Sequence, residues 1–362
     1  MAVYTPVSTS QAGLFLAGYD VGGLASIQPI AEGVENSNFL LNLHPTPIRD
    51  AGTGKEAGRL ILTLFEKRVR TDELPWFVGL MRHLAQAGMA VPAPVPNKAG
   101  QCLGRLQGRP ALLTRFLRGR SLGAGAITPQ ACHELGAAMA RLHVAGQSYT
   151  PERANALGPG SWQGLLARCH EMAHHQPTGS ESQAVAALAH LAGQALPGLL
   201  VQWPGAASCP RGQVHADLFP DNVFFTEGAE GSSRLAGMID FYFACTDLLA
   251  WDIAIALNAW CFDEPEGAVS VGGRALFNKD HAQALLAGYQ AVRPLVAGEV
   301  AALPVLCQGA AMRFLLTRLH DWLATPPGAL VTRKSPWVYG ERLQAFQRAD
   351  VVAVLRVLGK RS

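Results

Sequence analysis

A strand-rich island at residues 213–243, set between long helical patterns, constrains the fold of this chain more than any other feature. Its first half contains the run HADLFPDN, residues 215–222, and its second half contains MIDF, residues 238–241. Valine, isoleucine and phenylalanine flank both halves, so each polar cluster ends a strand-like run. Asp240 lies 18 residues beyond Asn222, which suits a short hairpin. We therefore expect Asp217, Asn222 and Asp240 to come together.

The residue types in this island are those that phosphoryl transfer to a hydroxyl requires. The catalytic loop of protein kinases reads H-R-D-x-x-x-x-N and is followed by D-F-G, and Asp217, Asn222 and Asp240 keep that order. A carboxylate there accepts the proton of the hydroxyl, while carboxylate and amide oxygens hold Mg²⁺ on the polyphosphate. We assign the first role to Asp217 and the metal role to Asn222 and Asp240, with His215 buttressing the loop. The alternative is a plain turn, because Asp and Asn also hydrogen-bond their own backbone in loops.

The first third of the chain predicts an antiparallel meander with one inserted helix. Short apolar runs bounded by turn residues are typical of strands, and apolar residues at helical spacing predict a helix over 74–87 that the proline-rich run 91–96 ends. The predicted strands cover residues 27–30, 39–43, 60–65, 102–106 and 111–116.

Beyond a linker at 118–123 the pattern becomes mainly helical. Helices are predicted over residues 128–145, 162–174, 183–196, 248–261, 281–289, 299–323 and 340–357. Segments 45–59, 175–182 and 263–275 are expected to be surface insertions. The sequence thus predicts an α+β, protein-kinase-like fold of two lobes. These are a small nucleotide-binding lobe, residues 1–116, with five antiparallel strands and one helix, and a larger, mainly helical catalytic and substrate-binding lobe, residues 117–362.

Composition limits the classes of binding partner and the cellular compartment that we expect for this chain. The net charge is +3, which argues against broad binding to nucleic acid or membrane surfaces. The seven cysteines have no CxxC spacing, so a reducing, cytoplasmic compartment fits better than a disulfide framework, and the first residues lack a basic region before an apolar run. The apolar stretch from Ala184 to Trp203 contains Pro197, and we expect a buried helix that ends near this proline rather than a membrane span.

The island and several longer stretches resemble a known family. HADLFPDN followed by IDF resembles the aminoglycoside-phosphotransferase-like branch of the protein-kinase-like superfamily, and within it the homoserine kinases. The similar stretches are AEGVENSNF (31–39), LILTLFE (60–66), HADLFPDNVFF (215–225), IDFYFAC (239–245), DIAIALNAWC (252–261) and RFLLTRL (313–319). This resemblance implies transfer of the ATP γ-phosphate to the hydroxyl of L-homoserine, a step in threonine biosynthesis, with ATP and Mg²⁺ as cofactors.

The resemblance also implies a nucleotide site on the first lobe. Gly33, Asn36, Ser37 and Asn38 lie between the first two strands, where backbone and side-chain groups of a small-residue turn can contact phosphate oxygens. The alternative is an ordinary polar hairpin turn. Thr63 stands where kinases usually carry a phosphate-binding lysine, which puts the usual lysine–glutamate pair in doubt. The adenine is expected near Phe116.

The substrate residues are expected in the second lobe, after the island. A carboxylate calls for a cation, and arginine offers it two parallel hydrogen bonds. Arg313 and Arg318 are five residues apart on an apolar helix, so one can face the site and the other the solvent. We also expect Tyr242, Asn258 and Trp260 to line the substrate pocket, each with a structural role as the alternative.

Other motifs are weaker. Gly54-Lys55-Glu56 resembles the end of a P-loop but has Glu56 where Ser or Thr is needed. His170-Glu171-Met172-Ala173-His174 matches HExxH, and we interpret its histidines as surface residues. Two other functions stay open. One is a kinase of another small alcohol, namely choline, methylthioribose or an aminoglycoside. The other is a nucleotide-binding pseudokinase without activity.

Overall fold

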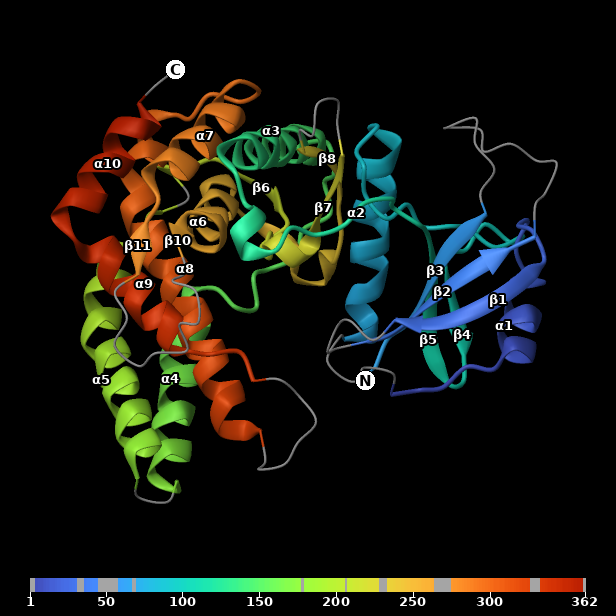
Figure 1. Ribbon diagram of the computed structural model, residues 1–362, viewed down its shortest axis with the longest axis horizontal. Coiled ribbons are helices and arrows are strands. Elements are labelled where there is room, and N and C mark those ends of the chain that lie inside the picture. The colour runs from blue at the N-terminus through green and yellow to red at the C-terminus, as the bar shows by residue number, and fades with distance from the viewer. Residues whose placement is uncertain are drawn as a thin grey trace. The chain divides into compact units, whose positions relative to one another are not determined.

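The structure is a computed structural model, and its chain divides into two compact units. The first unit contains Met1–Arg118 together with Gly237–Tyr242, and the second contains Gly119–Ala236 and Phe243–Ser362 (Figure 1). The residues that the structure describes are 4–30, 36–44, 58–66, 70–176, 179–205, 207–227, 233–263, 275–325 and 333–360. The expected insertions at 45–59 and 263–275, and the glycine of the phosphate loop, Gly33, lie wholly or largely outside these residues.

The first unit is built on a five-stranded antiparallel sheet of order β1-β2-β3-β5-β4. The first three strands form the predicted meander, and β5 rather than β4 pairs with β3. Helix α2 follows β3 and starts with a proline in its first turn, where the missing N–H costs nothing. The bounds are β1 Leu24–Ile30, β2 Ser37–Leu43, β3 Arg59–Leu64, α2 Leu74–Gln86, β4 Leu103–Leu106 and β5 Arg109–Arg115.

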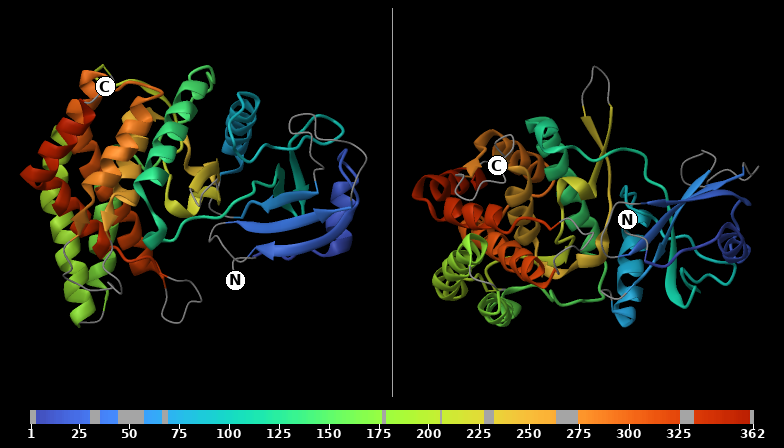
Figure 2. Two further views of the ribbon diagram at one scale, coloured as in Figure 1. Left: turned by 45° about the horizontal axis from the view of Figure 1, so that its top comes forward. Right: turned by 60° about the horizontal axis from the view of Figure 1, so that its bottom comes forward.

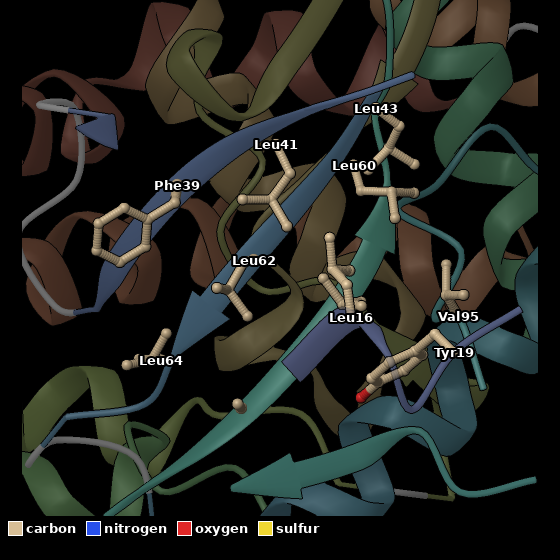
Figure 3. Packing of buried hydrophobic residues seen from close by; sticks show 11 residues of the cluster. Leu16, Tyr19, Phe39, Leu41, Leu43, Leu60, Leu62, Leu64 and Val95 are labelled. Atoms are coloured by element: carbon tan, nitrogen blue, oxygen red, sulfur yellow. The ribbon is translucent and has the colours of Figure 1, made fainter. Parts of the chain in front are cut away.

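One face of this sheet buries the core of the first unit. Residues in β2 alternate between buried and half-buried positions, as the two-residue period of a strand requires. Leu16 of helix α1, Thr9–Leu16, packs on these strands, and Figure 3 shows its side chain among those of Leu41, Leu60 and Leu62. Helix α1 was not predicted from the sequence. Its signal is a capping box, in which Ser8 and Gln11 bond each other's backbone N–H.

The second unit is mainly helical, as predicted (Figure 2). Its long helix α8 packs against α4, α6 and α9, and α3 packs along α7. Helix α3 begins at a threonine cap followed by proline, the start that the sequence predicted. The bounds are α3 Pro129–Gly146, α4 Pro159–His174, α5 Ser180–Val201, α6 Leu249–Trp260, α7 Lys279–Gln290, α8 Ala297–Ala324, α9 Trp337–Gln347 and α10 Ala349–Gly359.

Two helix predictions were wrong. The predicted helix over 340–357 is two helices, because Arg348 has an extended backbone (φ −70°, ψ 136°) between α9 and α10. Helix α5 does not end near Pro197 but continues to Val201, with Pro197 inside the helix, where it removes one hydrogen-bond donor. By length and composition alone, α5 and α8 among the described residues could cross a membrane. The most apolar window of α8 is 78% buried inside the structure, whereas that of α5 is 33% buried and contradicts the expected buried helix.

The island forms two short sheets and a link to the first unit. β6 (Arg211–Val214) pairs with β9 (Cys245–Leu248), and β7 (Val223–Glu227) forms the predicted hairpin with β8 (Ser233–Met238). The segment 237–242, assigned to the second lobe from sequence, belongs to the first unit. The N–H of Met238 donates to the carbonyl of Ala90 at 3.0 Å, and a Cβ on Gly237 would meet that same carbonyl.

Candidate active site

The loop between β6 and β7 contains Asp217, the aspartate predicted from sequence to accept the proton of the substrate hydroxyl. Asn222, in the 3-10 turn Pro220–Asn222, donates its Nδ2 hydrogens to the backbone oxygen of Asp217 at 2.8 Å and to its carboxylate Oδ2 at 3.1 Å. The Asp217 side chain is 17% exposed. The D-x-x-x-x-N spacing therefore closes a small ring that fixes the direction of the carboxylate while keeping it accessible.

The residue before this aspartate has a strained backbone that its neighbours hold in place. Ala216 has a φ of +61°, in the left-handed region that residues with a Cβ rarely adopt. The Asp252 carboxylate accepts the N–H of Ala216 at 2.6 Å and that of His215 at 2.7 Å. On the other side, Arg313 donates from Nη1 to the Ala216 carbonyl. Such strain persists only where the surroundings over-determine it and is frequent at active sites.

Arg313 reaches the loop from the middle of α8. Its side chain is 2% exposed, and Nη2 lies 3.9 Å from Oδ1 of Asp217. Its guanidinium carbon lies 4.5 Å from the centre of the Phe314 ring. Burial lowers the pKa of Arg313, and the charge of Asp217 opposes this shift. An arginine remains protonated even so, and Arg313 thus brings a buried positive charge next to the Asp217 carboxylate.

Asp252, in the first turn of α6, is completely buried and charged. Burial would raise the pKa of this carboxyl, but the hydrogen bonds that it accepts from His143 and from the His215 backbone outweigh burial, so the pKa lies below its usual value. His215 is itself buried, and its backbone N–H donates to Asp252. The buttressing role of the His215 side chain stays a prediction.

Two residues predicted to line the substrate pocket are buried and hydrogen-bonded inside the second unit. Trp260 donates from Nε1 to the carbonyl of Leu218 at 2.8 Å, so it fixes the loop that contains Asp217. Asn258 donates from Nδ2 to the carbonyls of Ala254 and Cys307. Both side chains are at most 1% exposed. The structure therefore does not support substrate contact by either, and it gives both a place in the core of the second unit.

Asp240 and Tyr242 belong to the first unit and are described within it. Asp240 has a φ of +63°, the second strained residue of the motif. The Tyr242 ring packs edge-on against Phe65 at 5.1 Å and Phe77 at 6.0 Å between ring centres. Burial, with the charge of Asp240, raises the pKa of Tyr242 well above its usual value, and a hydrogen bond to Thr63 acts in the opposite direction. This ring packing gives Tyr242 a structural role beside Asp240.

Ser37 and Asn38 of the expected phosphate loop lie at the start of β2, next to Asn36. The buried Ser37 hydroxyl accepts the N–H groups of Tyr4 and Thr5 and donates to Glu66 at 2.8 Å, so it fastens the N-terminal segment to the sheet. Thr63 donates from Oγ1 to Oδ1 of Asn38 at 2.8 Å. The side chains of Ser37, Asn38 and Thr63 are thus engaged in hydrogen bonds within the first unit.

Two other residues predicted to contact the nucleotide are Asn36, which is buried, and Phe116, which is half-buried. The Asn36 side chain accepts the N–H of Glu66 at 3.4 Å. Phe116, where the adenine is expected, carries the guanidinium of Arg59 at 4.3 Å from its ring centre. The Arg59 guanidinium therefore covers one face of the Phe116 ring in a cation–π contact.

A second group of cations surrounds Phe219, in the middle of the catalytic loop. Arg318, one and a half turns beyond Arg313 on α8, lies over the Tyr339 ring at 4.5 Å and over the Phe219 ring at 6.0 Å, and Nη1 donates to the carbonyl of Ser335. Lys334 places Nζ 6.0 Å from the Phe219 ring centre and 3.5 Å from the Asp221 carboxylate. Sequence reasoning missed Lys334, because a lone lysine outside any motif carries no local signal.

The donor set of the motif fits a magnesium ion. Asn222 carries an amide oxygen, Oδ1, in the second unit, and Asp240 carries a carboxylate at a strained backbone position in the first unit. Mg²⁺ binds oxygen ligands and usually takes one or two carboxylates together with substrate phosphates.

His170 and His174 of the HExxH match are exposed on α4, as predicted for surface residues.

The chain is similar to known phosphotransferases over most of its length. Residues 26–295 match the phosphotransferase enzyme family. The chain is 48% identical over 97% of its length to the whole of a protein named homoserine kinase from Gluconobacter oxydans. It is 50% identical over 96% of its length to 97% of one from Gluconacetobacter diazotrophicus.

Solved structures show the same fold at low identity. An aminoglycoside phosphotransferase from Alicyclobacillus acidocaldarius superposes with a TM-score of 0.62 at 16% identity, over 98% of this chain and 97% of the other. A microcompartment-associated aminopropanol kinase gives 0.58 at 18% identity, over 96% of this chain and 100% of the other. The predicted α+β, protein-kinase-like fold is confirmed.

Proposed function

The chain belongs to the phosphotransferase enzyme family and, within it, to the homoserine kinases, and we propose that the Asp217 loop carries out its reaction. The reaction transfers the γ-phosphate of ATP to the hydroxyl of L-homoserine. The hydroxyl oxygen forms a bond to the γ-phosphorus, the bond from that phosphorus to the bridging oxygen of ADP breaks, and the hydroxyl proton passes to the Asp217 carboxylate. The products are O-phospho-L-homoserine and ADP.

The observation that carries this assignment is the way the loop fixes one accessible carboxylate. Asn222 holds Oδ2 of Asp217, and the strained Ala216 peptide is bonded from both sides by Asp252 and Arg313. Catalysis of phosphoryl transfer is mainly positioning and electrostatic stabilisation. A carboxylate held within hydrogen-bond reach of the substrate hydroxyl supplies the positioning.

Asn222 and Asp240 are the proposed ligands of Mg²⁺, whose charge neutralises that of the ATP phosphates when it is bound. For the nucleotide we propose contacts from Asn36 and from Gly33, which lies outside the described residues, with the adenine beside Phe116. The hydroxyls of Ser37 and Thr63 are bonded inside the first unit, so we assign them to holding its strands.

For the substrate carboxylate we propose Arg318 and Lys334 rather than Arg313. Arg313 is buried and bonded to the Ala216 carbonyl, so its charge belongs to the loop. Arg318 and Lys334 are more exposed and flank Phe219, which lies between Asp217 and Asn222 in the loop. A guanidinium together with an ammonium group suits a carboxylate. The same pair would repel the polycationic aminoglycosides.

An assay of ADP release with a panel of alcohols tests the function. We expect turnover with L-homoserine and at most weak turnover with L-serine, choline and methylthioribose. Preferred turnover of choline would favour a kinase of another small alcohol. ATP binding without ADP release for any alcohol would favour the pseudokinase.

The seven buried free thiols support the proposal that the enzyme works in the reducing cytoplasm.

A further inference from the structure

A chain of buried polar side chains leads from the catalytic loop to a distant ion pair. It starts at Asp252, which accepts the N–H groups of His215 and Ala216, and it continues through His143 of α3 and Tyr289 of α7. It ends at the pair of Arg293 with Glu299 of α8. All these residues belong to the second unit.

The contacts are short throughout. Nε2 of His143 lies 3.1 Å from Oδ2 of Asp252, and Nδ1 of His143 lies 2.8 Å from the Tyr289 hydroxyl. Nη1 of Arg293 donates to that hydroxyl at 3.0 Å and to the Glu299 carboxylate at 3.0 and 3.2 Å. The N–H of Val296 completes the Glu299 site at 3.0 Å.

Only one direction of donation satisfies every group of this chain with a neutral histidine. Asp252 is ionised and can only accept, so Nε2 of His143 carries a hydrogen and Nδ1 accepts. The Tyr289 hydroxyl then donates to Nδ1 while its oxygen accepts from Arg293. Burial raises the pKa of Tyr289, so the phenol keeps the proton that it donates. Each bond polarises the next in a low-dielectric interior.

Stability alone is a poor reason for this arrangement. His143, Asp252, Tyr289 and Glu299 are all 0% exposed. Burying ionised groups costs free energy that their mutual attraction often fails to recover, and apolar residues of similar size frequently replace them without loss. These residues form one series of hydrogen bonds, and that series leads to the two backbone N–H groups that precede Asp217.

We propose that Tyr289 is a positioning residue for phosphoryl transfer, which sets the catalytic loop through His143 and Asp252. The proposal rests on the proposed role of the Asp217 loop. Tyr289 touches neither substrate nor nucleotide in this account. It orients the His143 ring, the ring orients the Asp252 carboxylate, and the carboxylate holds the strained Ala216 peptide that directs Asp217.

The test is the variant Tyr289→Phe, which removes one hydroxyl and keeps the ring. We expect kcat for L-homoserine to fall about 3- to 30-fold, the effect of leaving His143 and Arg293 short of a partner. KM for ATP and for L-homoserine should stay within about twofold. Hydrogen exchange at the Ala216 and His215 amides should become faster.

The control is Leu286→Val, which removes a methylene group from a buried side chain of the same helix without touching the chain of polar groups. It should lower the melting temperature while kcat and the two exchange rates stay at the wild-type values. Arg293→Lys is the second variant, and it should lower kcat in the same direction as Tyr289→Phe.

The outcomes separate the two proposals. If the wild-type enzyme forms no phosphohomoserine, the proposed function fails. If the wild type is active and Tyr289→Phe and Arg293→Lys keep its kcat and its amide exchange, the positioning role is wrong. A fall in kcat that Leu286→Val matches at equal melting temperature would also overturn it, because it would reflect stability alone.

Discussion

Arg313 is the residue whose loss should damage the active site most from outside the loop. It bonds the Ala216 carbonyl and puts a positive charge 3.9 Å from the Asp217 carboxylate. In Arg313→Met, a side chain of similar length keeps the packing on Phe314 but loses the charge-assisted hydrogen bond. We expect kcat to fall about 10- to 100-fold, which corresponds to about 1.5–3 kcal/mol. Steady-state kinetics with L-homoserine measures it, and a kcat within twofold of the wild type would contradict this role.

Arg318→Met should have the opposite kinetic signature. Arg318 is assigned to the carboxylate of the substrate, so its loss should raise KM for L-homoserine about 10-fold or more and leave KM for ATP unchanged. For L-homoserine amide, which carries no carboxylate, the KM of this variant should be nearly the same as that of the wild type. Equal losses for the acid and the amide would show that Arg318 does not read this group.

At the residue scale the sequence predicts the reacting groups and misses their supports. Asp217, Asn222 and Asp240 are predicted from sequence because the reaction requires their residue types at fixed spacing. His143, Tyr289 and Arg293 were not found, because the fold alone brings α3, α6 and α7 together. Asn258 and Trp260 illustrate the converse case. They follow the motif closely in sequence, yet α6 is buried on nearly all of its faces, so both side chains lie in the core.

At the scale of elements, α3 and α7 approach so closely that their contact requires glycine. A Cβ on Gly288 would collide with the backbone of His133, and one on Gly136 with the backbone of Leu285. Gly288→Ala should therefore destabilise the protein by about 1–3 kcal/mol, the usual cost of overpacking. Urea unfolding followed by circular dichroism measures this loss.

Gly193→Ala in α5 is the matched control. Its Cβ would meet only ordinary contacts of 3.9 Å, so the greater helix propensity of alanine should stabilise the protein by about 0.5–1 kcal/mol. Equal effects of the two substitutions would show that the α3–α7 approach is not the cause.

Element types were more predictable than element ends. Strand and helix periods located β1 to β5 and α2, since buried faces impose them. The break at Arg348 between α9 and α10 escaped prediction, because neither glycine nor proline marks it and packing against α8 decides it. The pairing of β5 with β3 escaped for a similar reason, since α2 and β4 intervene in the sequence.

At the scale of the whole molecule, the chain is held together without disulfides. The seven cysteines are all buried and free. The melting temperature should therefore be the same with and without a reductant, and the denatured, unreduced protein should titrate seven thiols. A lower melting temperature in reductant, or fewer thiols, would contradict this description.

The division into units could be predicted from sequence only in part. The change from strand-like to helical patterns locates the boundary near residue 118. The membership of 237–242 in the first unit depends on contacts distant in sequence, such as the hydrogen bond of Met238 to Ala90 and the packing of Tyr242 on Phe65. Local sequence patterns do not predict contacts between residues that are distant in sequence.

The central claim is that Asp217 accepts the proton of L-homoserine, and Asp217→Asn tests it most directly. Asparagine keeps the size of the side chain and an oxygen that can accept the hydrogen bond of Asn222, but it is not a base. The rate of O-phospho-L-homoserine formation at saturating ATP should fall about 100- to 10,000-fold, as for loss of a general base, while the affinity for ATP is kept. Turnover at a rate similar to the wild type would contradict the account.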